Sequence, residues 1–255
     1  MASYIFPQYE NLLARVRSER IMMWAAIEND FLAVTSEFDT KFVAGEMAKG
    51  DYKAKARYFN DLVAAIVTNR TGQHIGSRGK RAGAAFAQHD VDLVYPDPMG
   101  LSAVRKLNCK PLLCGETKIA GTPPYPGNKG TSGEDGRPVK QDLDKRAREM
   151  VTTAIDLKRR WSEGPIVLEE TGLRASDPKY GIFYACRIAT ESDRTTIVER
   201  LTQIARLYVD GVGMFFYACD QTSPTAYHKA ADVPGFSIDD VITLFQNSIL
   251  AETVQ

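Results

Sequence analysis

Glu116 and Lys118 stand two residues apart at the end of an apolar segment, residues 111–119. Side chains two residues apart on a β-strand point to the same face, so this carboxylate and this ammonium are expected to project together. A buried carboxylate needs a cationic partner or a metal ion, and Mg²⁺ prefers the hard oxygen atoms of carboxylates. The pair therefore predicts a site in which Glu116 holds a divalent cation, while Lys118 orients a water molecule or offsets the charge of a phosphate.

Three aspartates on or just after the preceding predicted strand are candidates for a second ligand of the same cation. Residues 91–95 are mainly apolar, which indicates a strand, and the two prolines that flank Asp97 stop it. In an antiparallel hairpin, an aspartate before the turn can lie across from Glu116. Asp90, Asp92 and Asp97 are the candidates on this side of the hairpin.

An aspartate on one strand and Glu-x-Lys on the next, after a helix, resemble the motif of the PD-(D/E)XK nuclease superfamily, to which many type II restriction endonucleases belong. The resemblance covers roughly residues 55–160. Pro96-Asp97 is the literal match to the start of the motif, but an aspartate between two prolines is typical of a turn. The family's aspartate is usually followed by apolar strand residues, as Asp92 is by a leucine and a valine. Asp92 is therefore preferred, with Asp97 and Asp90 as alternatives.

The resemblance implies a Mg²⁺-dependent deoxyribonuclease that hydrolyses phosphodiester bonds in double-stranded DNA. Asp92 and Glu116 would bind Mg²⁺, and Lys118 would orient the attacking water. The expected enzyme is a sequence-specific type II restriction endonuclease of a restriction–modification system, and a homodimer, because a two-fold protein matches a palindromic site. The alternatives are a repair or mobile-element nuclease of the same superfamily, which would cut by structure or context, and a DNA-binding module without catalysis.

Three further residues near the motif bear on the site. Family members often place another glutamate on the helix before the first strand, and Asn60 and Asp61 occupy that region here. Either one is a candidate substitute, so the number of metal ions stays open. His89 stands beside the aspartates and is a candidate general base, although a packed histidine is the commoner case.

Cations next to glycines predict further contacts to DNA. In residues 72–83, four glycines are interspersed with Arg78, Lys80 and Arg81. Glycine lets the main chain approach closely, and arginine and lysine bind phosphates. The glycine spacing does not match a Walker A loop, so ATP binding is not expected. Lys129 lies in a proline- and glycine-rich segment, residues 121–138, which predicts a long loop placed to enter a DNA groove. The basic face of the helix that follows is another candidate surface.

The elements that position these residues follow from the spacing of apolar side chains. A helical period predicts helices within the first 50 residues and over 53–69, 141–161, 197–208 and 237–249, and apolar runs predict strands over 91–95, 111–119, 181–186 and 213–219. The first two strands indicate a hairpin, and the later alternation of helix and strand indicates parallel pairing through helical crossovers. We therefore expect an α/β (α+β) fold with a central mixed sheet flanked by helices, as in restriction endonucleases. A single nuclease domain would span residues 1–255, with residues 1–50 as a helical N-terminal element.

The composition fits a protein of this kind. The chain has 255 residues, a formal net charge of zero and 44% hydrophobic residues, which is ordinary for a globular protein and argues against a passive DNA-coating protein. The N-terminus lacks a basic segment followed by an apolar run, and no apolar stretch reaches about 18 residues, so neither a signal peptide nor a membrane span is expected. The four cysteines form no CxxC pair and the three histidines are scattered, which indicates free thiols in a reducing cytoplasm and no zinc site.

Overall fold

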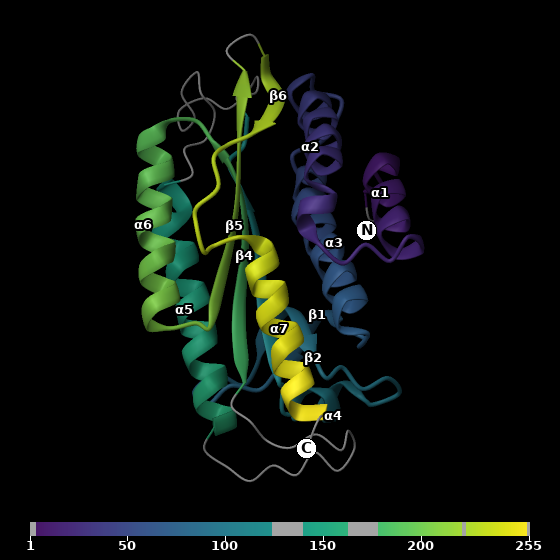
Figure 1. Ribbon diagram of the computed structural model, residues 1–255, viewed down its shortest axis with the longest axis vertical. Coiled ribbons are helices and arrows are strands. Elements are labelled where there is room, and N and C mark those ends of the chain that lie inside the picture. Colours follow the sequence, from purple (N-terminus) through teal and green to yellow (C-terminus); the bar gives the residue numbers. More distant parts are fainter. Residues whose placement is uncertain (1–3, 124–139, 163–177, 221–222, 254–255) are drawn as a thin grey trace.

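The computed structural model describes residues 4–123, 140–162, 178–220 and 223–253, and in these residues six strands form one mixed sheet (Figure 1). The strands lie side by side in chain order: β1 (Gly76–Arg81), β2 (His89–Tyr95), β3 (Leu113–Ala120), β4 (Lys179–Ile188), β5 (Gly211–Asp220) and β6 (Ser223–Lys229). β1, β2 and β3 pair antiparallel, β3, β4 and β5 pair parallel, and β6 returns antiparallel to β5. The expected α/β fold with a mixed sheet is confirmed, including the antiparallel pairing of the two site strands.

Helices cover both faces of this sheet (Figure 1). On one face lie α5 (Lys140–Ser162) and α6 (Glu191–Leu207), the crossovers that make the β3–β4 and β4–β5 pairs parallel. The other face carries α1 (Pro7–Ser18), α2 (Glu28–Val43), α3 (Ala54–Thr71) and α7 (Ile238–Thr253). The shorter elements are η1 (Trp24–Ala26), η2 (Asp51–Lys53) and α4 (Ala103–Leu107).

Each face of the sheet has its own apolar core. The apolar stripe predicted on the long helix α5 is confirmed, and it packs with α6 onto side chains of β4 and β5. Side chains of β3 alternate between the two cores, since Leu113 packs on the α3 side and Cys114 on the α5 side. Glu116 and Lys118 follow Cys114 at intervals of two residues, so both point to the α5 face of the sheet.

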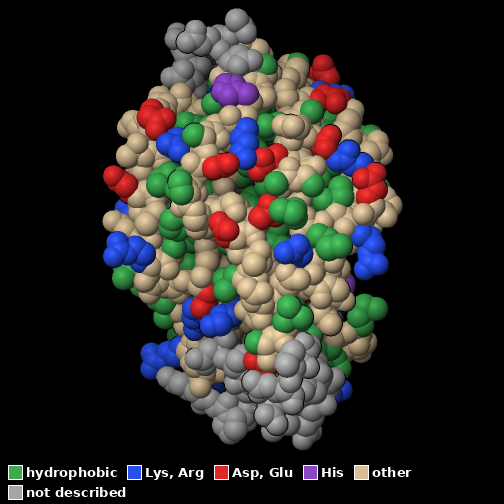
Figure 2. Space-filling model, viewed as in Figure 1, with side chains coloured by type: hydrophobic (Ala, Val, Ile, Leu, Met, Phe, Trp, Pro, Cys, Tyr) green, Lys and Arg blue, Asp and Glu red, His purple; other side chains and the backbone are tan. Residues whose placement is uncertain are grey.

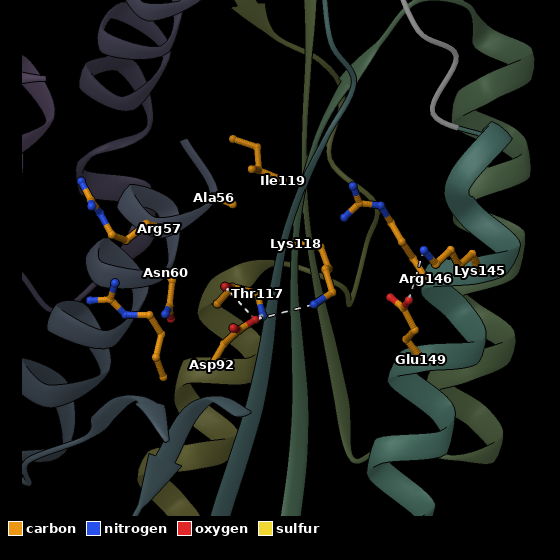
Figure 3. A pocket seen from close by; sticks show the side chains of 11 residues that line it. Ala56, Arg57, Asn60, Asp92, Thr117, Lys118, Ile119, Lys145, Arg146 and Glu149 are labelled. Atoms are coloured by element: carbon orange, nitrogen blue, oxygen red, sulfur yellow. Dashed lines mark hydrogen bonds and ion pairs between the residues drawn. The ribbon is translucent and has the colours of Figure 1, made fainter. Parts of the chain in front are cut away.

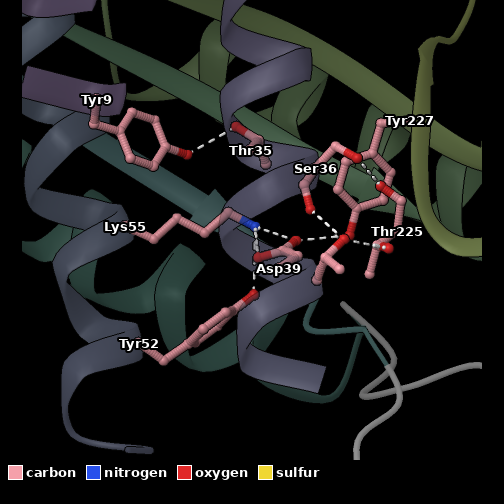
Figure 4. A network of polar contacts seen from close by, with 9 residues as sticks. Tyr9, Thr35, Ser36, Asp39, Tyr52, Lys55, Thr225 and Tyr227 are labelled. Atoms are coloured by element: carbon pink, nitrogen blue, oxygen red, sulfur yellow. Dashed lines mark hydrogen bonds and ion pairs between the residues drawn. The ribbon is translucent and has the colours of Figure 1, made fainter. Parts of the chain in front are cut away.

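A buried ion pair ties α2, α3 and β6 together (Figure 4). Lys55 on α3 donates hydrogen bonds to both carboxylate oxygens of Asp39 on α2, at 2.9 and 2.7 Å, and both side chains are buried. Tyr227 on β6 donates a further hydrogen bond to Asp39 at 2.6 Å. Burial lowers the pKa of Lys55, and the Asp39 carboxylate opposes that shift. The network fixes the position of α3, the helix that carries one wall of the cleft described below.

The structure departs from the sequence-based elements in several places. The N-terminal helical segment is divided, because the non-helical residues 19–23 separate α1 from η1 and α2. The glycine-rich segment before the first predicted strand is itself a strand, β1, whose mostly exposed side chains show no apolar alternation. The strand β6 and the short helix α4 are also additional to the prediction. Residues 124–139, most of the expected long loop, lie outside the described part of the chain.

The surface agrees with the composition. None of the described helices is both long and apolar enough to cross a membrane. All four cysteines carry free thiols, as their spacing predicts. On the face shown in Figure 2, acidic and basic side chains are interspersed without a large field of one sign.

Candidate active site

The site is built where two strands part. β2 and β3 pair through residues 93–95 and 113–115, and the pairing ends there. Immediately beyond, the Asp92 carboxylate accepts a hydrogen bond from the backbone N–H of Thr117 at 2.8 Å and another from its hydroxyl at 3.2 Å. A side chain thus takes the place of the next backbone pairing, which holds Asp92 at the edge of β3 next to Glu116 and Lys118.

One ammonium group lies close to two carboxylates at this fork. The Lys118 Nζ donates a hydrogen bond to Glu116 Oε2 and lies 3.7 Å from Asp92 Oδ2. The exposed fraction of the side chain rises from 8% at Glu116 through 19% at Lys118 to 30% at Asp92. Glu116 and Lys118 therefore share one face, as the strand period predicts, and the group opens to solvent on the Asp92 side.

The electrostatics of the fork favour additional positive charge. Burial raises the pKa of the Glu116 carboxyl, and the nearby Asp92 carboxylate adds to this rise, while the Lys118 ammonium opposes it. Two carboxylates next to a single cation leave negative charge uncompensated. A divalent cation between them would stabilise the ionised form of Glu116.

A cleft of about 570 Å³ opens over the fork, between α3 and α5 (Figure 3). Asp92, Thr117, Lys118 and Ile119 line its floor; Ala56, Arg57 and Asn60 of α3, Arg78 of β1, and Lys145, Arg146 and Glu149 of α5 line its walls. Five of these side chains are cationic and two are acidic. A cleft with this excess of positive charge suits a phosphate-rich ligand.

The oxygen donors at the fork fit a hard divalent cation. Asn60 is 2% exposed, and its side-chain oxygen has no hydrogen-bond partner among the described residues, although its amide nitrogen donates to Ser77 Oγ at 3.4 Å. A buried acceptor without a partner requires an explanation, and a cation bound on the floor of the cleft, which Asn60 and Asp92 both line, would provide one. Within the described residues, no group of three or more His, Cys, Asp and Glu side chains is arranged to hold a metal ion. The Asn60 amide, backbone carbonyls and water would therefore complete the ligand set.

Of the three candidate aspartates, Asp92 is the one that the structure brings to Glu116. Asp97 lies five residues further along the chain, about 16 Å in extended conformation, on the far side of the paired stretch. It accepts a hydrogen bond from Lys106 Nζ at 3.1 Å instead. Asp90 is exposed and lies 3.4 Å from Lys80.

The predicted DNA contacts divide into three groups. Arg78 lines the cleft, at a positive φ of 60°, and its guanidinium contacts Asp61 at 3.2 Å. Lys80 is exposed on β1, outside the cleft. Arg81 is a correction: its side chain is fully buried, and it donates hydrogen bonds to the carbonyls of Lys80 and Pro96 at 2.8 and 2.7 Å, so it is not available to DNA. Lys129 lies outside the described residues.

Two other expectations also change. Only Lys145 and Arg146 of the basic face predicted on α5 line the cleft. His89 contacts Asp156 at 2.7 Å and is largely buried, so it is a packed residue and does not serve as a base in this cleft.

Sequence reasoning missed two charged cleft residues, Glu149 and Arg57. Glu149 lies four residues after Lys145 on α5, and Arg57 three residues before Asn60 on α3. Residues at these spacings share a helix face, so helical periodicity around the candidate residues would have found both.

Comparisons with known proteins give no match: the chain matches no family model, no curated protein and no solved structure. Its function is therefore inferred from the geometry of the cleft together with the motif.

Proposed function

We propose that this chain is a metal-dependent endonuclease that hydrolyses phosphodiester bonds in double-stranded DNA. The observation that carries the proposal is the convergence of three side chains at the strand fork: Asp92 and Lys118 line the floor of a cationic cleft, and Lys118 contacts the buried Glu116. Two carboxylates and an ammonium at this separation meet the needs of phosphodiester hydrolysis, which are metal ligands, a held water molecule and positive charge at the phosphate.

Each residue of the fork has a distinct role in this proposal. Asp92 and Glu116 would hold Mg²⁺, and the buried amide oxygen of Asn60 would be a third protein donor. When bound, the metal ion polarises the attacking water and offsets the charge on the scissile phosphate. Lys118 reaches both carboxylates, so its ammonium is placed to orient the water and to stabilise the negative charge that develops.

The walls of the cleft position the DNA. Arg57 of α3 lies on one side, together with Arg78, which pairs with Asp61 of the same helix, and Lys145 and Arg146 of α5 lie on the other side. Phosphates on either side of the scissile bond can therefore meet a cation on each wall, which fixes the register of the backbone over the fork. These contacts carry no sequence information themselves.

The finer assignment is a type II restriction endonuclease that acts as a homodimer in the cytoplasm. It is supported by the resemblance of the motif to the PD-(D/E)XK superfamily and by four free thiols, which suit a reducing compartment. Symmetric subunits would meet the two halves of a palindromic site.

Digestion of a sequence-diverse plasmid pool with Mg²⁺ or Mn²⁺, followed by sequencing of the new ends, tests the proposal. We expect the wild type to cut DNA and Glu116→Gln not to cut it. The control Glu19→Gln, which changes an exposed acid directly after α1, should cut DNA as the wild type does. Ends that share one sequence support a restriction enzyme, and cuts confined to junctions or damaged sites point to a structure-dependent nuclease. If no DNA of any sequence or methylation state is cut, the proposal is wrong.

A further inference from the structure

A second hollow lies next to the cleft, between the edge strand β1 and the short helix α4. Its volume is about 470 Å³, and β1 supplies a continuous part of its wall, residues 77–81. Arg78 lines both this hollow and the cleft, so the two are adjacent. β1 is the outermost strand of the sheet, and the hollow therefore lies beyond the sheet edge.

The hollow carries an excess of positive charge. Arg78 and Lys80 are more than half exposed, at 53% and 55%, and Lys106 of α4 is 31% exposed. The one acid in its wall, Asp97, accepts a hydrogen bond from Lys106 at 3.1 Å. Since the whole chain has a net charge of zero, this excess is a local property and favours an anionic ligand.

The remainder of the lining favours a sugar–phosphate chain over a small inorganic anion as the ligand. α4 contributes the apolar side chains of Ala103, Val104 and Leu107. A phosphate ion would gain nothing from these groups, whereas the deoxyribose of a nucleotide packs against apolar surface. Lys80 on the strand pairs with Asp90 at 3.4 Å, whereas Lys106 on the helix pairs with Asp97 at 3.1 Å, so the two ammonium groups have different partners, which suits a chain of phosphates.

We infer that this hollow binds the phosphodiester backbone of the substrate DNA next to the cleft, with Lys80 and Lys106 as its phosphate contacts. The inference rests on the proposed function, and it extends the substrate beyond the scissile phosphate. Arg78, at the border, contacts the backbone between the fork and the hollow. Asp97 is then a competitor for Lys106, so this carboxylate weakens DNA binding and takes no part in catalysis.

Salt-dependent binding of a labelled random-sequence DNA duplex tests the inference, measured by fluorescence anisotropy in the Glu116→Gln background without divalent metal. Each phosphate contact contributes about 0.9 to the slope of log K against log salt concentration. Lys80→Ala with Lys106→Ala should therefore lower the slope by about 1.8, and weaken binding about 60-fold at about 0.1 M salt if counterion release supplies the whole contact energy. The control variant Arg17→Ala with Lys49→Ala removes the same charge. Both residues are exposed and line neither the cleft nor the hollow, so this variant should leave the slope unchanged.

A second variant guards against loss of folding. Asp97→Asn should tighten binding, because it frees Lys106, and misfolding would not produce such a gain; the control Glu19→Gln changes the net charge equally. Equal slopes for wild type and the hollow variant, or equal losses for the hollow and control variants, overturn the inference. Cleavage by the wild type distinguishes a failure of this inference from a failure of the proposed function. If the wild type cuts DNA but the Lys80 and Lys106 substitutions leave DNA binding unchanged, only the inference is refuted. Hollow-dependent binding without any cleavage refutes the nuclease and leaves the inference standing.

Discussion

Glu116→Gln should abolish cleavage while leaving the metal-free protein at least as stable as the wild type at neutral pH. Burial raises the pKa of Glu116 above its ordinary value of 4.5. The folded protein therefore holds this proton more tightly than the unfolded chain. The contribution of Glu116 to the free energy of unfolding is complete below about pH 4.5 and is lost as the pH rises through the raised folded pKa. Glutamine keeps the shape of the side chain and cannot ionise, so the variant lacks this loss.

Binding of a divalent cation should make the wild type more stable than Glu116→Gln. A ligand at ten times its dissociation constant stabilises the folded state by RT ln 11, about 1.4 kcal/mol. For a chain of this size, 1 kcal/mol shifts Tm by about 2–4 °C, so the wild type should gain about 3–6 °C. Glu116→Gln loses one of the two carboxylates at the fork and should gain almost nothing at the same concentration.

Differential scanning calorimetry in EDTA, Mg²⁺ and Mn²⁺, repeated from pH 4.5 to 8, measures both effects. The exposed acid Glu19 supplies the control, since Glu19→Gln should follow the wild type throughout. A Tm of Glu116→Gln that rises with metal as much as that of the wild type would refute metal binding by Glu116. An equal fall in stability with rising pH in the metal-free variant and the wild type would refute the raised pKa of Glu116.

Four further outcomes follow from the structure. Asp92→Asn should abolish cleavage, whereas Asp97→Asn should retain it; the reverse result in the plasmid assay would mean that the literal Pro-Asp is the catalytic one. Lys118→Met should bind Mn²⁺ more tightly than the wild type in calorimetric titration, because the competing ammonium is gone, and yet fail to cut DNA; weaker binding would contradict the placement of Lys118 beside the metal site. Lys55→Met should lower the free energy of unfolding by about 3–5 kcal/mol, because it leaves a buried carboxylate unpaired, and Asp39→Asn in the same chain should recover much of the loss in urea unfolding. Burial raises the pKa of five tyrosines (Tyr9, Tyr52, Tyr180, Tyr217 and Tyr227) above 10, so their stabilisation holds below about pH 10 and is lost as the pH rises through their folded values; tyrosinate absorbance that appears before unfolding would contradict this.

The residues of the fork could be predicted because strand geometry is local. A period of two places Glu116 and Lys118 on one face without any tertiary information. The same reasoning separates Asp92, inside an apolar run, from Asp97, between prolines, and the structure places Asp92 at the fork. Periodicity also suffices for the order of helices and strands from β2 to α7, apart from α4 and β6, since the other elements bury a continuous apolar face.

The surroundings of the fork could not be predicted, because they depend on contacts between distant segments. Arg81 looks like its neighbours Arg78 and Lys80 in sequence, yet it is fully buried and donates a hydrogen bond to the carbonyl of Pro96, which lies 15 residues away and is brought near only by the fold. β1 has little apolar surface, so its residues show no apolar alternation that would predict a strand. The unsatisfied oxygen of Asn60 becomes visible only when α3 is packed over the sheet.

Lys118 links the stability of the empty site to its proposed activity. Two carboxylates at a partly buried fork would repel each other, and the Lys118 ammonium, in contact with Glu116 and 3.7 Å from Asp92, offsets that repulsion in the metal-free protein. A divalent cation that binds the same oxygens competes with this ammonium. The ammonium then needs another anion, and the phosphate of bound DNA is the one that the cationic cleft admits. A metal ion would free the Lys118 ammonium to pair with the phosphate, and a bound phosphate would draw the ammonium away from the carboxylates. The two ligands should therefore bind more tightly together than separately.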